Sequence, residues 1–355
     1  MTDKGKTRVV KFTDFHLDKA VDVEEKEVEW LIPGYIPRYG ITTIAGEGGV
    51  AKTTIWCALV ASITSGKPFF MQGNNPPPFI CKPENVAVFS AEDSWEYVLK
   101  KRLAANGADM DRVLYMGPED ERFADLNFNG ELLKGLIVTN KPDLVVYDPV
   151  QAFVPENLRM GDRNAMRKCL SPLIGFGETY KTTSIVIAHA NKQSGVWGRK
   201  RIADSSDIWD ASRSVLMVGM VPNGDGLRYI SQEKSNYGKL QDTVIFDLHD
   251  GAPVFKSYTT KKDRDFVLED SKVKHSNTSA VDVAKDFILS ALCEHKQMKI
   301  EELDELAAAC GISKSTLKEA KADLAREQQT HTWSLGYGKD KKFFITLKAT
   351  ENNSE

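Results

Sequence analysis

The sequence is poor in the features that mark zinc modules, secreted disulfide proteins and membrane proteins. Its five cysteines are far apart, with no C-x-x-C pair and no nearby histidine at ligand spacing. This excludes a zinc module of the usual spacing and argues against a disulfide framework. No apolar run approaches the roughly 20 residues that a membrane helix needs, and residues 1–22 contain no apolar signal-peptide core. These absences predict a cytoplasmic protein without a membrane segment.

The net charge is also small. Lys and Arg number 47 and Asp and Glu number 50, so the net charge of −3 gives no global positive field for nucleic acid. Any contact with nucleic acid must therefore come from local patches. The length of 355 residues predicts two domains, and the 41% hydrophobic and 9% aromatic residues exclude disorder of the whole chain.

Short β-branched runs alternate with segments of helical period between residues 28 and 255. The runs at 145–147 and 185–187 are apolar on both faces, as strands inside a parallel sheet must be. Strands without intervening helices follow, so we expect an α/β core with a mostly parallel sheet and an antiparallel extension. The predicted strands are 41–45, 86–90, 113–116, 144–148, 184–189, 214–218, 227–232 and 244–248. The predicted helices are 52–65, 95–105, 130–139 and 165–180.

The other parts of the chain are more polar or have a separate plan. We expect a flexible arm over 1–27 and a linker over 256–280, where charged residues show little helical or strand period. A small α+β domain is predicted over 281–348, with helices at 281–295, 300–309 and 313–327 followed by strands at 330–335 and 342–347. Residues 349–355 form a tail.

A glycine-dense turn between a predicted strand and a predicted helix is the most informative stretch. Its sequence, GEGGVAKTT, resembles the phosphate-binding pattern G-x-x-x-x-G-K-[ST]. Glycines let successive backbone N–H groups face phosphate oxygens, and the helix N-terminus adds partial positive charge. We expect Lys52 to reach the terminal phosphates and the Thr53 hydroxyl to complete a Mg²⁺ shell. The predicted cradle for ATP consists of Gly46, Gly48, Gly49, Val50, Ala51, Lys52, Thr53 and Thr54.

Ala51 departs from the pattern because it stands where the second glycine belongs. If the backbone there has a positive φ, alanine is costly, whereas at negative φ it costs little. A glycine-rich turn that binds no ligand is the alternative interpretation of this stretch.

Three further predicted strands deliver polar residues to the edge where an open α/β sheet binds its ligands. Asp148 ends one strand and is the candidate acid for holding Mg²⁺, with a capping turn as the alternative. Glu92 follows another strand and is a candidate general base for water, and Asp93 beside it is a supporting acid. Adjacent acids at a helix start also simply favour the helix dipole. His189 ends a third strand as a γ-phosphate sensor or a structural histidine.

These motifs occur in one order together with WLIPG at 30–34, HANK at 189–192 and SRSVL at 212–216. The set resembles the RecA-like P-loop ATPases of the RepA-type hexameric replicative helicase group of plasmids, phages and other mobile elements. The resemblance covers about residues 28–255. It implies an ATPase and DNA helicase that assembles into a ring, usually a homohexamer, with ATP and Mg²⁺ at subunit interfaces.

The resemblance also implies roles for single residues. Glu92 corresponds to the catalytic glutamate, Asp148 to the Walker B acid and His189 to the sensor. Arg213 corresponds to the arginine finger that acts on the neighbouring subunit, where it stabilises transition-state charge. Lys234 is a second candidate for action in trans, and an ordinary surface arginine and lysine are the alternatives.

A basic loop at 193–206 is the candidate contact for single-stranded DNA. It contains Arg199, Lys200 and Arg201, with Trp197 available for stacking, and in a ring such loops face the central channel. The loop at 156–163 is a weaker candidate. A solvated basic loop without a partner is the alternative.

The C-terminal segment resembles winged-helix domains. Lys314, Lys318 and Lys321 share one face of the predicted helix 313–327, and the turn at 336–342 would form the wing. Such a helix can enter the major groove of duplex DNA. Winged helices also bind proteins, and the acids Glu319 and Asp323 interrupt the basic face, so a protein partner is the alternative.

The sequence thus predicts an ATP-driven motor that unwinds DNA, with three alternatives. The first is a loader or recombination-type filament former that does not unwind. The second is a partition or regulatory switch, because the P-loop echoes that of ParA-like proteins, although Glu47 stands where that group has its signature lysine. The third is a DNA-binding regulator with an inactive ATPase core.

Overall fold

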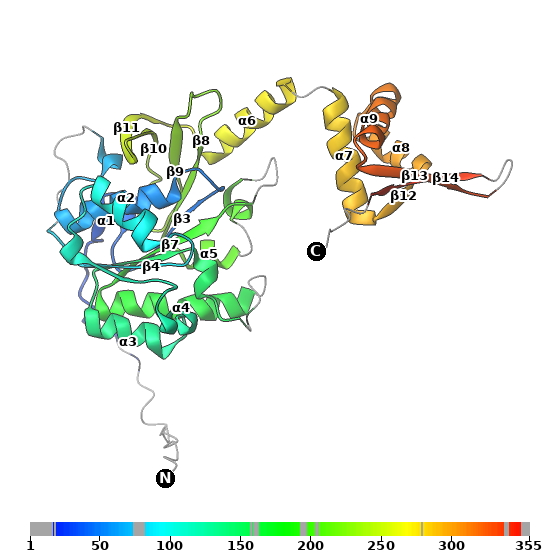
Figure 1. Cartoon of the computed structure of the whole chain (residues 1–355). Coiled ribbons are helices and arrows are strands. Elements are labelled where there is room, and N and C mark those ends of the chain that lie inside the picture. Colours follow the sequence, from blue (N-terminus) through cyan, green and yellow to red (C-terminus); the bar gives the residue numbers. More distant parts are fainter. Residues whose placement is uncertain are drawn as a thin grey trace, which may run out of the picture.

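A nine-stranded sheet runs through the larger part of the computed structural model (Figure 1). The structure describes residues 17, 19–73, 82–156, 158, 163–191, 197–202, 206–277, 280–336 and 341–348. The strand order is β11-β10-β9-β8-β3-β7-β6-β4-β5; the strands from β8 to β5 are parallel, and β9, β10 and β11 extend the sheet antiparallel. The predicted fold class is confirmed. The strands are β3 (Ile41–Gly46), β4 (Val86–Ser90), β5 (Val113–Met116), β6 (Leu144–Asp148), β7 (Thr183–His189), β8 (Ser214–Met220), β9 (Arg228–Ser235), β10 (Thr243–His249) and β11 (Ala252–Thr259).

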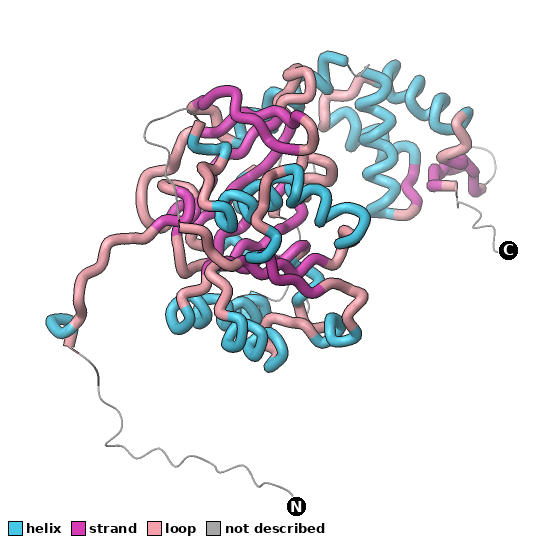
Figure 2. The backbone as a smooth tube through the Cα atoms, turned by 60° about the vertical axis from the view of Figure 1, so that its left-hand side comes forward, coloured by secondary structure: helices cyan, strands magenta, loops and turns pink. Residues whose placement is uncertain are grey.

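Helices cover both faces of this sheet (Figures 1 and 2). One face packs against α1 (Lys52–Ser65) and α2 (Lys100–Ala105), and the other packs against α3 (Glu131–Asn140), α4 (Arg163–Tyr180) and α5 (Ser206–Ala211). Alternate residues of a strand point to opposite faces, so Val146 belongs to the first core and its neighbour Val145 to the second. Both sides of the central strands are therefore apolar, as the sequence predicts.

Shorter elements complete the larger unit. A small ribbon of β1 (Trp30–Ile32) and β2 (Ile36–Pro37) packs into the first core, and a π-helical turn over Trp95–Leu99 leads into α2. Most of the predicted arm lies outside the described residues. The 3₁₀ turns are Ala20–Asp22, Phe70–Gln72, Met110–Arg112, Glu121–Asp125, Val150–Phe153 and Gly198–Arg201.

The expectation of a linker without regular structure over 256–280 is wrong. Its first residues finish β11, and α6 (Asp263–Asn277) follows. The first turn of α6 belongs to the core: Asp263 is buried, and the ring of Phe266 stacks on Tyr229 with centroids 4.1 Å apart. The periodic signal was weak because β11 has one buried residue, Pro253, and Phe266 is the one α6 residue that enters an apolar core cluster of the described chain.

The C-terminal elements form a separate small core. They are α7 (Ala280–His295), β12 (Gln297–Lys299), α8 (Ile300–Ala309), α9 (Lys314–Arg326), β13 (Thr330–Leu335) and β14 (Lys342–Leu347), with the antiparallel sheet order β12-β14-β13. Leu317, Ala320 and Leu324 of α9 are buried in this core. The predicted helices and strands are confirmed, β12 is additional, and residues 337–340 of the predicted wing turn lie outside the described residues. Within the described parts of the chain, no helix is both long and apolar enough to cross a membrane.

Candidate functional site

The carboxyl ends of four adjacent parallel strands bring the predicted site residues together. In the sheet order β3-β7-β6-β4, these ends lead to the glycine-rich turn, His189, Asp148 and Glu92. In an open α/β sheet the ligand crevice lies outside this edge. The order of elements along the chain therefore places a phosphate-binding turn, two carboxylates and an imidazole around one crevice.

The glycine-rich turn has the backbone that a phosphate cradle requires. Gly46 packs against β8, where an added Cβ would lie 2.6 Å from the carbonyl oxygen of Val218, so a side chain does not fit. Gly48 and Gly49 have open space where a Cβ would lie, and Gly49 has a φ of 79°. The turn is thus closed on the sheet side and open on the side from which phosphate would approach.

Ala51 has a φ of 78° and a ψ of 26°, in the left-handed region. The position therefore does need a positive φ, and alanine is the costly residue there. We expect Ala51→Gly to raise the free energy of unfolding by about 0.5–1 kcal/mol, because relief of left-handed strain exceeds the added chain entropy of glycine. Denaturant unfolding measures this difference. Ala58→Gly, inside α1, is the matched control and should lower stability by about 1 kcal/mol; equal losses in both variants would contradict the account.

Lys52 begins α1 and turns its side chain back over the turn. Its ammonium donates to the carbonyl oxygens of Gly46 at 2.9 Å and Glu47 at 2.8 Å. Burial lowers the pKa of Lys52, and the carboxylates of Asp148, Glu92 and Glu47 oppose this effect. The ammonium thus lies inside the turn, within the reach that a phosphate-binding lysine needs.

Asp148 is buried at the end of β6, with 4% of its surface exposed. The indole Nε1 of Trp56, on α1, donates to its Oδ2 at 2.7 Å and fixes the orientation of the carboxylate. Burial raises the pKa of Asp148 to about 6, and the carboxylates of Glu92 and Asp93 add to this, whereas the Trp56 hydrogen bond and Lys52 oppose it. A cation that met this carboxylate would relieve a buried negative charge.

Asp148→Asn should stabilise the protein without nucleotide and Mg²⁺ above neutral pH. The folded-state pKa of about 6 exceeds the unpaired value of 3.8, so the carboxyl stabilises the fold below about pH 4 and loses that contribution as the pH rises through 6. Asparagine can still accept from Trp56. We expect the variant to be equal to wild type near pH 4 and more stable by roughly 3 kcal/mol near pH 7.5, measured by denaturant unfolding. A difference that does not change with pH would contradict the assignment.

Glu92 and His189 meet across the crevice. The imidazole Nε2 lies 3.2 Å from the Glu92 Oε1, and both side chains are accessible to solvent. A carboxylate that is partly exposed and held by a histidine is suited to activating water. Asp93 instead forms an ion pair with Arg102 at 3.0 Å on the α2 side. The structure therefore brings Glu92 and His189 together and directs Asp93 to a different partner.

The donor set suits Mg²⁺ shared with a phosphate. Mg²⁺ takes oxygen ligands and is usually held by one or two protein groups together with phosphates and waters. Thr53 and the Asp148 carboxylate supply such oxygens at neighbouring element ends. Among the described residues there is no group of three His, Cys, Asp or Glu side chains that could hold a metal ion on their own. Thr53 and Asp148 would hold the ion, which neutralises charge on the phosphates.

Arg213 and Lys234 lie together at the opposite end of the sheet, where the parallel strands begin. Arg213 directly precedes β8, which runs parallel to β3, so it lies beside the start of β3 and away from the turn at its end. Lys234, on β9, is paired with Val215 of β8, and its ammonium donates to the carbonyl oxygens of Trp209, Asp210 and Ser212 at 2.7–3.1 Å. Neither residue can reach the phosphate cradle of its own chain. Their roles in trans stay predictions. To act on a neighbouring subunit, Lys234 would first have to break its hydrogen bonds to these three carbonyl oxygens.

Arg201 is not available for the predicted DNA contact. The residue is 6% exposed, and its guanidinium forms an ion pair with Asp263, a hydrogen bond to the Tyr229 hydroxyl at 3.2 Å and an ion pair with Glu47 at 3.3 Å. The correction has a plain cause: the neutralising acid, on α6, is 62 residues away in sequence. Arg201 therefore ties the phosphate turn to α6.

The rest of the predicted channel loop is only partly described. Lys200 is exposed, whereas Arg199 pairs with Asp210, and Trp197 lies under the Arg264 guanidinium of α6 at 5.0 Å. Residues 192–196 and 203–205, like Arg159 and the Arg163 side chain, lie outside the described parts. Of the predicted trio, Arg199 and Lys200 are exposed, and Arg199 is held by its ion pair with Asp210.

The lysines of α9 also differ from one another. Lys314 and Lys318 are exposed, as predicted. Lys321 is half-buried and donates to Asp304 of α8 at 2.7 Å. The basic face of this helix is therefore reduced to two free-standing lysines.

Three contacts near the site could not be named from the motifs. Trp56 orients Asp148, and Glu47 and Asp263 share Arg201. A weak signal existed for Trp56, since its position four residues after Lys52 puts both on one face of α1. No local pattern indicates the other two.

A comparison with protein families fits this geometry. A family model described as an AAA domain matches residues 6–195, which is more than half of the chain. The chain belongs to the AAA domain family. Its core is thus a P-loop ATPase domain, and nucleotide binding with Mg²⁺ is the shared property of such domains. A KaiC-like protein from the hyperthermophilic archaeon Pyrococcus horikoshii OT3 is similar in structure, with a TM-score of 0.45 and 16% identity over 65% of this chain and 100% of that one. No curated protein matches the sequence.

Proposed function

We propose that this AAA domain protein is an ATP-hydrolysing motor that forms a ring, acts on DNA and works as a replicative-type helicase of a mobile genetic element or phage. The observation that carries the proposal is that the candidate site residues are divided between the two ends of the parallel strands. One crevice, at the carboxyl ends of the parallel strands, is surrounded by Lys52, Asp148, Glu92 and His189. Arg213 lies at the other end, where these strands begin. An arginine that completes the site must then come from a neighbouring subunit, which favours head-to-tail assembly and ring closure.

A mixing experiment tests the shared site. Arg213→Ala and Glu92→Ala are each expected to be inactive alone, because every interface then lacks either the finger or the base. In an equal mixture, about a quarter of the interfaces combine an intact Glu92 with a neighbour's intact Arg213, so roughly a quarter of wild-type ATP turnover should return. No recovery at any mixing ratio would refute catalysis in trans.

Strand-displacement assays with ATP separate the helicase from the loader and filament alternatives. The proposal expects ATP-dependent release of a labelled strand from a forked duplex, abolished in Lys52→Ala. Electron micrographs with an ATP analogue and single-stranded DNA should show closed sixfold particles. Open helical filaments without strand release would favour the loader, and ATP turnover absent with and without DNA would favour the regulator.

A further inference from the structure

The outer face of the C-terminal sheet carries an aromatic pair that packs outside the core. Paired residues of neighbouring strands point to the same face, and β13 pairs Thr332 with Ile345 on the inner face, where Ile345 is buried. The alternate pairs, Trp333 with Phe344 and Leu335 with Lys342, therefore share the outer face. The rings of Trp333 and Phe344 are stacked, with centroids 4.6 Å apart and planes 15° apart.

An exposed apolar residue and an exposed lysine flank this pair on the outer face. Leu335 is 62% exposed and its cross-strand partner Lys342 is exposed too, at the end of the hairpin that Figure 1 shows projecting from the C-terminal unit. Phe343 pairs with Ser334 and therefore points to the other face of the sheet, where the Lys341 ammonium lies 5.2 Å from its ring. Aromatic side chains therefore lie next to lysines in this hairpin, although the net charge of the whole chain is −3.

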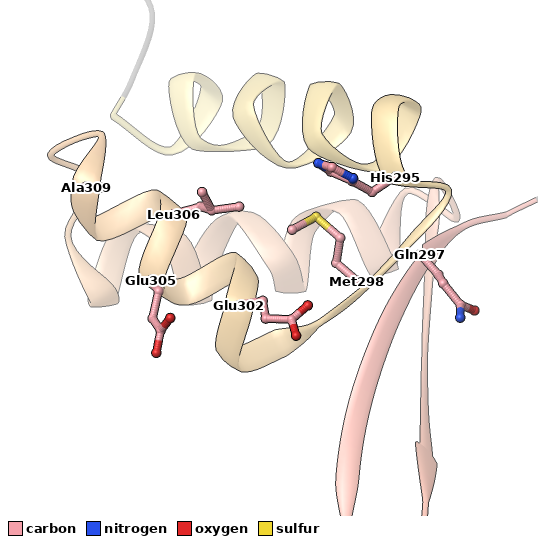
Figure 3. A pocket seen from close by; sticks show the side chains of 7 residues that line it. All are labelled: His295, Gln297, Met298, Glu302, Glu305, Leu306 and Ala309. Carbon is pink, nitrogen blue, oxygen red and sulfur yellow. The ribbon is translucent and has the colours of Figure 1, made fainter.

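The charge of this face differs from that of the adjacent helix. Residues 330–335 and 341–348 include three lysines and no acid, whereas α8 alone has four acids. Glu302 and Glu305 line a hollow between α7 and α8 with His295, Met298 and Leu306 (Figure 3). The acidic helix repels phosphate, so a polyanion is favoured only on the hairpin.

We propose that the outer face of β13 and β14 is a stacking platform for unpaired bases of a single-stranded nucleic acid. Bases of a single strand can stack on Trp333 and Phe344, and Lys342 on the same face can hold a flanking phosphate. Duplex bases are already stacked on each other and cannot reach the rings. The site is distinct from the lysine face of α9 and from the core loops, and it adds to the proposed motor a grip that does not require ATP cleavage.

The test uses the full chain and a fluorescein-labelled oligo-dT without nucleotide, so that a failure of the ATPase assignment does not affect it. Trp333→Ala should weaken binding about tenfold or more, whereas Trp333→Tyr keeps a stacking ring and should stay near wild type. The matched control is Tyr97→Ala, which removes an exposed aromatic from the core unit. A blunt duplex of the same length should bind equally to all of these variants.

Two further readouts keep the proposal falsifiable. Saturating oligo-dT should quench the part of the tryptophan emission that is lost in Trp333→Phe. Lys342→Glu should weaken binding and flatten its salt dependence. Unchanged affinity in Trp333→Ala, absence of this quenching, or an equal loss for duplex and single strand would each overturn the platform; the first two would leave a protein partner as the occupant of this face.

Discussion

Replacing Lys52 with alanine is expected to abolish ATP hydrolysis while the protein stays folded. The ammonium donates to two carbonyls of the glycine-rich turn, and Lys52 belongs to no apolar core cluster of the described residues, so its loss should leave secondary structure intact. In a phosphoryl transfer it would stabilise charge on the terminal phosphates, and loss of one such group lowers turnover by at least about a hundredfold.

Steady-state ATPase assays and circular dichroism check this result together. The matched control is Lys67→Ala, which removes an exposed lysine just beyond the other end of α1 and should leave both turnover and fold unchanged. Turnover near the wild-type level in Lys52→Ala would refute the phosphate-binding role of the turn.

The second large effect is expected at the buried pair of Arg201 and Asp263. Either Arg201→Ala or Asp263→Ala leaves one charge in the core without its partner, and such losses cost about 3–5 kcal/mol. The double variant Arg201→Met with Asp263→Leu removes both charges and should cost less than either single change. Denaturant unfolding measures all three.

An exposed pair provides the control for this cycle. Arg199→Ala breaks the solvent-accessible contact with Asp210 and should cost less than about 1 kcal/mol. If the single changes at Arg201 and Asp263 cost no more than this control, then the pair does not hold α6 on the core. If the double variant is the least stable of all, then the charges themselves stabilise the fold.

Much of the fold follows from local pattern. β6 has an apolar run on both faces, a capping proline and a clear length, so its predicted bounds agree with the structure; the same holds for β4, β5, α1 and α8. β11 and α6 were missed because neither shows a repeated apolar face: β11 has one buried residue, and Phe266 is the one described α6 residue in an apolar core cluster. Periodicity reports burial along an element, and the described residues of these two elements bury little.

The part of the candidate site that lies at the carboxyl ends of the parallel strands could be predicted from the sequence. Parallel strands deliver Asp148, Glu92 and His189 to one edge once their order is known. What the sequence could not supply were distant partners: Trp56 meets Asp148 across 92 residues, and Arg201 meets Asp263 across 62. The backbone angle of Ala51 was also out of reach, because the residue type leaves both signs of φ open.

The most direct test of the account is an equilibrium titration of the purified protein with labelled ATP, with and without Mg²⁺. The account predicts saturable binding that depends on Mg²⁺ and is strongly weakened in Lys52→Ala. Absence of saturable binding at every protein concentration would contradict it, because the glycine-rich turn would then hold no triphosphate.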